Sequence, residues 1–187
     1  MKLLNKNIIA LSLLFIFGCA SPDSIKINVD SDIRNSPTKT GSFQITTIDK
    51  RATQDIAVIR YTDKTKKSIH TSNSPSDVIN SAIREGLSNS GHFNSADAKA
   101  TINVELRRLN GKIDQGSVSY KAQLNAQIKV VIKHPKKTLT KQFKGQKKFK
   151  GAFTLNMDEL EENMNELLSS LVDDIINDGE IHRLIAQ

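Results

Sequence analysis

Apolar and polar residues alternate with a period of two along much of the chain, which is the pattern of half-buried β-strands. The alternation appears first over 25–29, returns over 43–47 and in a short run over 56–61, and then recurs in three segments between residues 100 and 153. The middle segment aligns eight apolar residues on one face, from Val118 to Ile132. That is long for one strand, so we expect a bend or bulge within it. We also expect Gly145 to interrupt the register of the last segment.

Two stretches have the periodicity of amphipathic helices. In the first, Ser74 fits the N-cap, Pro75 the first helical position and Gly91 the stop. The second opens after Asn156 and carries an apolar stripe to residue 176, and we expect it to end at Gly179. The apolar residues over 181–185 allow a short terminal helix.

This order of elements predicts an α+β fold. We expect a two-layer domain in which an antiparallel sheet of about four to six strands packs against two amphipathic helices and keeps its other face polar. The expected organisation is a lipoprotein signal peptide over 1–18, a lipid-anchored tether over 19–41 and a periplasmic domain over 42–187. The alternation over 25–29 falls inside the tether. It fits either a short edge strand of this domain or a segment that adds to the sheet of another chain.

The N-terminus has the layout of an export signal. Lys2 and Lys6 precede a ten-residue segment over 8–17 that is apolar except for Ser12. A ten-residue helix rises about 15 Å, half the ~30 Å of a bilayer core, so the segment indicates a cleaved signal and not a membrane-spanning helix.

Gly18 and Cys19 form a lipobox at the end of this segment, and Cys19 is the only cysteine of the chain. We expect cleavage between them, with a diacylglycerol and an N-acyl chain (palmitate or a similar acid) on Cys19. The alternative is an ordinary secretory signal with an incidental cysteine, and Phe17 departs from the usual small residue. An aspartate directly after the lipidated cysteine retains lipoproteins at the inner membrane, and this chain has Ala20 there. We therefore expect the protein to be anchored at the periplasmic face of the outer membrane.

Composition argues against an enzyme or a metalloprotein. One cysteine excludes an intrachain disulfide and a cysteine-based zinc ribbon, and the four histidines have no ligand-like spacing. The sequence lacks a G-x-S-x-G elbow and a phosphate-binding glycine loop. We therefore expect no enzymatic activity and no cofactor apart from the acyl chains on Cys19.

Charge is strongly segregated within a net charge of +7. Residues 129–150 hold nine lysines and no acid, and residues 158–180 hold nine acids and no lysine or arginine. These runs are either solvated faces or a docking patch for an anionic wall polymer, lipid headgroups or an acidic protein. Nucleic acid is not expected in the periplasm. The candidate docking residues are Lys136, Lys137, Lys141, Lys144, Lys147, Lys148 and Lys150.

Several short motifs carry a family resemblance. These are the lipobox, QGSVSY over 115–120, GAF over 151–153 and EIHRLI over 180–185. In this order and spacing the chain resembles the YajG-type lipoproteins of Gram-negative bacteria, although its last long strand is unusually rich in lysine. The resemblance implies a periplasmic, membrane-anchored α+β domain and implies no activity.

The sequence thus favours a non-catalytic, outer-membrane-anchored accessory module that interacts with protein partners, as in a secretion or motility complex that spans the envelope. The alternative is a binder or carrier of cell-wall or lipid fragments. A hydrolase is a third hypothesis, and it requires His92, His134 and His182 to converge.

Overall fold

The computed structural model describes residues 24–34 and 39–187. The predicted signal peptide, Gly18 and Cys19 lie outside the described residues. The described elements follow the order β1 (Ser24–Ile25), β2 (Ser42–Asp49), β3 (Ala57–Tyr61), β4 (Lys66–Thr71), α1 (Pro75–Asn89), β5 (Phe93–Asn94), β6 (Ala100–Gln115), β7 (Ser119–His134), β8 (Lys137–Ala152), α2 (Met157–Ile176) and α3 (Gly179–Ile185).

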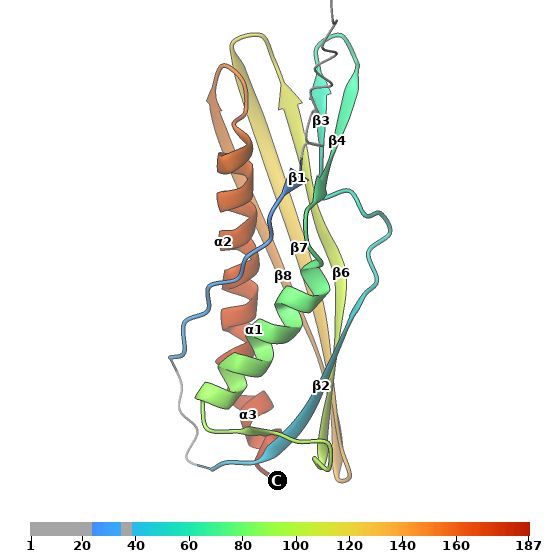
Figure 1. Cartoon of the computed structure of the whole chain (residues 1–187), viewed down its shortest axis with the longest axis vertical. Coiled ribbons are helices and arrows are strands. Elements are labelled where there is room, and N and C mark those ends of the chain that lie inside the picture. Colours follow the sequence, from blue (N-terminus) through green and yellow to red (C-terminus); the bar gives the residue numbers. More distant parts are fainter. Residues whose placement is uncertain (1–23, 35–38) are drawn as a thin grey trace, which may run out of the picture.

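The strands form one curled, mixed sheet of eight strands with three helices on its inner side (Figure 1). The expectation of an antiparallel sheet with four to six strands was wrong. β6 pairs parallel with β2 along its first half and parallel with β3 along its end, while β7 and β8 pair antiparallel beyond it. The connection from β2 to β6 passes through three strands and α1, and such a long crossover permits parallel pairing.

Three long strands, β6, β7 and β8, have 16 residues each and run the length of the molecule. The predicted irregularity lies in β6, between Leu106 and Arg108, and not in β7. Gly145 does not break the register of β8, because it pairs with Ala126 in an uninterrupted ladder. A Cβ at Gly145 would lie 2.7 Å from Leu167 Cδ1, so the lack of a side chain at Gly145 allows helix α2 to pack close to the sheet.

Both predicted amphipathic helices are confirmed. Ser74 caps α1 by accepting the Asp77 amide at 3.3 Å, and Asn156 caps α2 by accepting the Asp158 amide at 3.1 Å. α2 ends before Gly179, because Asn177 follows its last residue and Asp178 caps α3. The buried stripes of α1 and α2 pack on the inner face of the sheet to form the core.

Residues 24–34, which we call the N-terminal arm, lie along α2 within the predicted tether. Of the two interpretations of the alternation there, the structure shows a segment packed in its own chain: Ile25 and Ile27 are buried, and β1 pairs parallel with β4. Alternate backbone amides of the arm then donate to side chains spaced four residues apart along α2 and its C-cap residue. These pairs are Lys26–Glu161, Asn28–Asn165, Asp30–Ser169, Asp32–Asp173 and Arg34–Asn177.

Candidate functional site

The predicted lysine patch divides between the two sides of strand β8. Successive residues of a strand face opposite sides, and the odd-numbered positions of β8 face the helices. Lys141 and Lys147 therefore point inward, whereas Lys144, Lys148 and Lys150 are exposed on the outer face. The lysines of β8 that the sequence treated as one surface thus lie on two opposite faces of the strand.

The inward lysines are paired with acids of the C-terminal helices. Lys141 Nζ lies 2.5 Å from Asp178 Oδ2 and 2.7 Å from Glu180 Oε2, and Lys147 pairs with Glu166. Burial works against ionisation of Asp178, but Lys141 and two backbone amides outweigh it and hold the pKa of that carboxyl below its usual value. These lysines join β8 to the helices.

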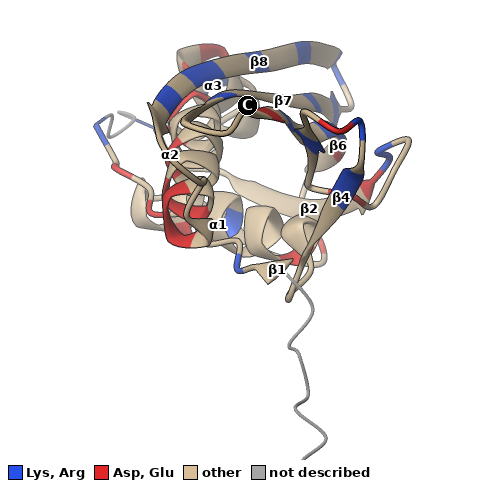
Figure 2. Ribbon diagram, turned by 90° about the horizontal axis from the view of Figure 1, so that it is seen from above, with Lys and Arg blue, Asp and Glu red and all other residues tan. Residues whose placement is uncertain are grey.

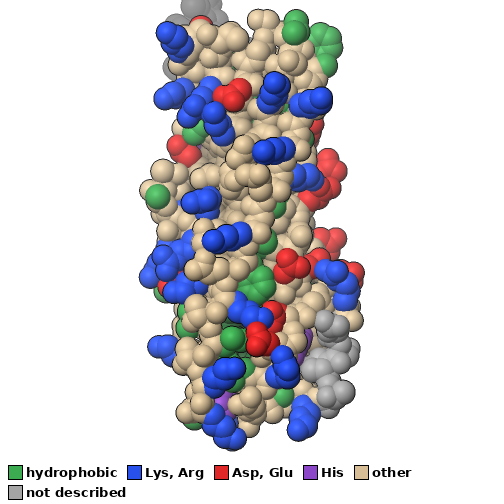
Figure 3. Space-filling model, turned by 180° about the vertical axis from the view of Figure 1, so that it is seen from behind, with side chains coloured by type: hydrophobic (Ala, Val, Ile, Leu, Met, Phe, Trp, Pro, Cys, Tyr) green, Lys and Arg blue, Asp and Glu red, His purple; other side chains and the backbone are tan. Residues whose placement is uncertain are grey.

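The outward lysines belong to a wider basic surface, which we call the lysine face. It comprises Lys112, Lys121, Lys144, Lys148 and Lys150. The strand register places Lys121 beside Lys150, and Lys112 beside Gln123, which in turn pairs with Lys148. Of these five lysines, only Lys112 has a carboxylate partner within the described chain, Asp114 at 3.5 Å. Figure 3 shows basic side chains spread along this side of the molecule, with several acidic ones at its right margin and a few among the basic ones.

A groove of about 470 Å³ crosses the lysine face near the end of β6. Four of the five lysines line it, together with Asp114 and Gln123. Sequence reasoning missed Lys112 and Lys121, because it considered only the run of lysines in one segment. Both occupy polar positions between buried neighbours on β6 and β7, and that alternation was the available signal.

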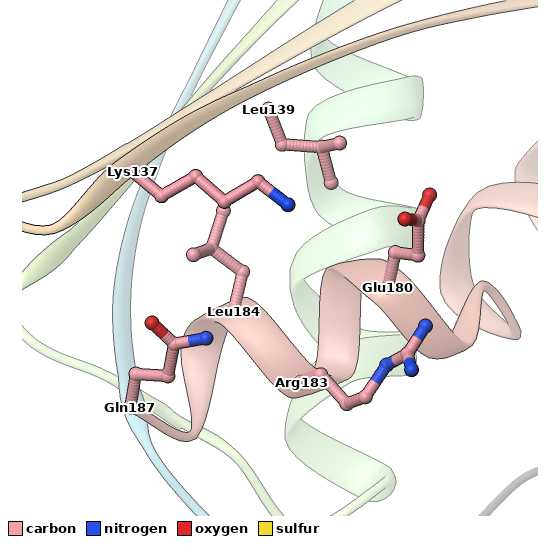
Figure 4. Close-up of a pocket in the computed structure, with 6 residues that line it drawn as sticks. All are labelled: Lys137, Leu139, Glu180, Arg183, Leu184 and Gln187. Atoms are coloured by element: carbon pink, nitrogen blue, oxygen red, sulfur yellow. The ribbon is translucent and has the colours of Figure 1, made fainter.

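The other predicted patch residues lie at the opposite end of the molecule. Lys136 is in the turn before β8, and Lys137 reaches toward helix α3 (Figure 4). Lys137 and Arg183 line a small pocket of about 230 Å³ with Glu180 and Gln187 over Leu139 and Leu184. Typical ligand pockets measure about 300–1,000 Å³, so this one is small for a wall or lipid fragment.

Two histidines that the sequence placed on separate elements meet in the interior. His92 is 1% exposed and His182 4%, and His92 Nε2 lies 2.8 Å from His182 Nδ1. The Gly41 amide donates to His92 Nδ1, and His182 Nε2 lies 2.7 Å from the carbonyl oxygen of Ile176. All four ring nitrogens are therefore hydrogen-bonded, two to each other and two to the backbone. Such a pair connects parts of the fold and leaves no ring nitrogen for a substrate. Among residues 24–34 and 39–187, no three His, Cys, Asp or Glu side chains form a metal-like group.

Two of the motifs that carry the family resemblance, QGSVSY and GAF, have structural roles at one end of the sheet. Tyr120 donates to Glu159 and stacks edge-on against Phe149, with ring centroids 6.1 Å apart. Burial and the Glu159 carboxylate raise the pKa of Tyr120 to about 12. A Cβ at Gly151 would lie 2.4 Å from the Tyr120 hydroxyl oxygen, so glycine there makes room for the ring.

These features define a mixed-sheet domain that carries a basic outer face. The family model of an uncharacterized lipoprotein matches residues 29–186, so the chain belongs to that family, and the YajG-type resemblance is confirmed. No curated protein matches the chain. In the described part of the chain, no helix is both long and apolar enough to span a membrane.

A solved structure shares the fold. A crystal structure of a Xanthomonas campestris protein of the DUF330 family aligns with a TM-score of 0.52 at 10% identity, covering 82% of this chain and 91% of that one. A second crystal structure, of an uncharacterized protein, aligns with a TM-score of 0.46 at 13% identity and covers 81% and 97%. At this level of identity, the first likeness concerns the fold alone.

Proposed function

We propose that this lipoprotein is a non-catalytic accessory module, anchored through Cys19 to the periplasmic face of the outer membrane. Its lysine face docks an acidic protein partner in a complex that spans the envelope, of the kind used in secretion or motility. The observation that carries the proposal is the division of β8. Lys141 and Lys147 are neutralised by helix acids, while Lys144, Lys148 and Lys150 have no carboxylate partner in the described chain.

Physical considerations favour a contact function on this face. Exposed lysines along an edge strand prevent unwanted strand pairing, and that role needs no further partner. The lysine face, however, extends across three strands to Lys112 on β6, well beyond the edge. A field from clustered like charges attracts a surface of opposite sign and speeds its association.

The test is crosslinking in intact cells from a photoreactive residue at position 148, with mass spectrometry of the products. We expect a crosslinked envelope protein that has an acidic surface. Co-purification of this protein is then measured at low salt with a chain that lacks the photoreactive residue. It should fall strongly when Lys144, Lys148 and Lys150 are replaced by glutamine. Replacing the exposed Lys26, Lys39 and Lys66 removes the same charge elsewhere and should leave co-purification intact.

Two outcomes would reject the lysine face as the docking surface. One is unchanged co-purification after the triple replacement on β8. The other is an equal loss in the control triple, which would mean that only the net charge matters.

A further inference from the structure

Two large apolar side chains project together from one end of the molecule. Val118 is 73% exposed and Phe153 is 74% exposed, and the Phe153 amide donates to the Val118 carbonyl at 2.9 Å. Val118 lies in the turn from β6 to β7 and Phe153 in the connection from β8 to α2, at the upper end in Figure 1. We call this pair the apolar tip. The alternation places Val118 on the same face as the apolar residues up to Ile132, but Val118 lies in the turn before β7 begins and is exposed.

The tip is held in place by a backbone conformation that is unfavourable for phenylalanine. Phe153 has φ of +62°, in the left-handed region, which costs a non-glycine residue on the order of 1 kcal/mol or more. The Gln115 side chain fixes the connection by donating to the Phe153 carbonyl at 2.8 Å and accepting the Leu155 amide at 3.1 Å. An aromatic ring held outward at such a cost suggests a function for the ring outside the fold.

The chain enters the fold near this same end. The N-terminal arm runs parallel to α2, starting where the Lys26 amide meets Glu161 at 2.7 Å, close to the first turn of that helix. Phe153 lies only four residues before the first residue of α2. The first described residue, Ser24, is therefore on the side of the molecule from which α2 and the tip begin.

The length of chain between Ser24 and Cys19 is about equal to the distance from Ser24 up to the end of the sheet that carries the tip. Ser24 lies five positions after Cys19, and five residue steps of extended chain span at most about 18 Å. The register pairs Ser24 with His70, and Ala57 with both Ile69 and Gly111, so Ser24 lies about five strand residues below Gln115. At about 3.3 Å per residue this depth is roughly 17 Å. A bilayer that holds Cys19 therefore lies close to the upper end of an upright molecule.

We propose that the apolar tip inserts into the interface of the bilayer that anchors Cys19, with Lys121 and Lys150 at the headgroups beside it. This inference rests on the anchor of the proposed function. Lys121 and Lys150 are each within three residues of a tip residue, and anionic headgroups attract such lysines. Figure 2 shows acidic residues along the ribbon of α2. An anionic bilayer would repel that side of the molecule, which favours contact through the tip.

The test uses tryptophan fluorescence, because the chain contains no tryptophan of its own. The full lipidated protein carrying Phe153→Trp is reconstituted into vesicles of phosphatidylcholine and phosphatidylglycerol, with and without brominated acyl chains. The matched control is Phe93→Trp. Phe93 is 64% exposed and pairs with Ser42, next to the start of β6 at the opposite end of the sheet.

We expect the Phe153→Trp protein to shift its emission to shorter wavelength on reconstitution and to lose most of its intensity with brominated lipid. The Phe93→Trp protein should do neither. Val118→Trp provides a second reporter and should behave like Phe153→Trp. Vesicle-bound protein with no quenching at either tip position, or with equal quenching at position 93, would overturn the tip contact while leaving the anchor intact. Protein that does not co-sediment with vesicles would overturn the anchor and the tip contact together.

Discussion

His92 Nε2 lies 2.8 Å from His182 Nδ1, which joins the loop after α1 to the C-terminal helix α3 through two buried rings. The Gly41 amide donates to His92 Nδ1, so the proton of neutral His92 is on Nε2 and points at His182. Burial and the neighbouring His182 lower the pKa of His92 below 6.5. Protonation of His92 would place an N–H on Nδ1, against the N–H of the Gly41 amide.

The first prediction concerns pH. Because the folded chain binds this proton less readily than the unfolded chain, the free energy of unfolding should fall as the pH drops below about 6.5. Urea denaturation at pH 7.5, 6.5 and 5.5 measures this trend. A His92→Gln variant, although less stable, should depend less on pH over this interval. A free energy of unfolding that stays constant or rises toward pH 5.5 would contradict the prediction.

The second prediction concerns the ion pair beneath the sheet. Lys141→Gln leaves Asp178 without its cation, and we expect a loss of about 1–2 kcal/mol of stability, a value discounted for partial exposure. Since the pKa of Asp178 is lowered, this contribution is present above its ordinary value of 3.8 and disappears as the pH falls below it. Lys144→Gln, on the outer face, should change stability by less than about 0.5 kcal/mol. Equal effects of the two substitutions would contradict the assignment of inward and outward lysines.

The third prediction concerns Gly151. A Cβ in Gly151→Ala would meet the Tyr120 ring, and such overpacking costs about 1–3 kcal/mol. Displacing the ring from Glu159 should also lower the pKa of Tyr120 from about 12 toward 10, which an ultraviolet titration detects. Gly179→Ala is the control, because nothing lies within 4 Å of a Cβ there. An unchanged Tyr120 titration in Gly151→Ala would refute the proposed contact.

The fourth prediction concerns the N-terminal arm. Asn165 accepts the Asn28 amide at 3.0 Å and donates to the Lys26 carbonyl at 3.1 Å. Asn165→Ala should therefore cost about 1–2 kcal/mol and speed hydrogen exchange of the arm amides. Ser170→Ala, on the exposed side of the same helix, should do neither. Exchange rates over 26–34 that are identical in the two variants would show that the contacts with α2 do not hold the arm.

Much of the fold follows from local patterns. The caps at Ser74 and Asn156 and the alternating apolar positions identified both helices and the long strands. The direction of strand pairing could not be predicted, because a period of two is the same in parallel and antiparallel strands. Strand β4 was missed because its sequence, KKSIHT, has one buried residue, Ile69, and forms a strand through pairing with β3.

The candidate surface was predicted only in part. Lys141 and Lys147 share the phase of the half-buried Phe143 and Phe149, so their inward direction was readable from the sequence. Their acidic partners were not, because the packing of α2 and α3 on β8 is a tertiary property. The same reason hid the contact between His92 and His182, which are 90 positions apart. The polar residues spaced along α2 from Glu161 to Asn177 have the pattern of a solvent-exposed helix face. In the structure they accept hydrogen bonds from the N-terminal arm instead.

The anchor on Cys19 underlies both the docking proposal and the tip contact, and one measurement tests it directly. Cells that express the wild-type protein or Cys19→Ser are labelled with a palmitate analogue and fractionated on a sucrose gradient. The account predicts that wild-type protein is labelled and sediments with outer membranes, whereas Cys19→Ser carries no label and leaves the membrane fraction. Label and outer-membrane sedimentation that persist in Cys19→Ser would contradict the account.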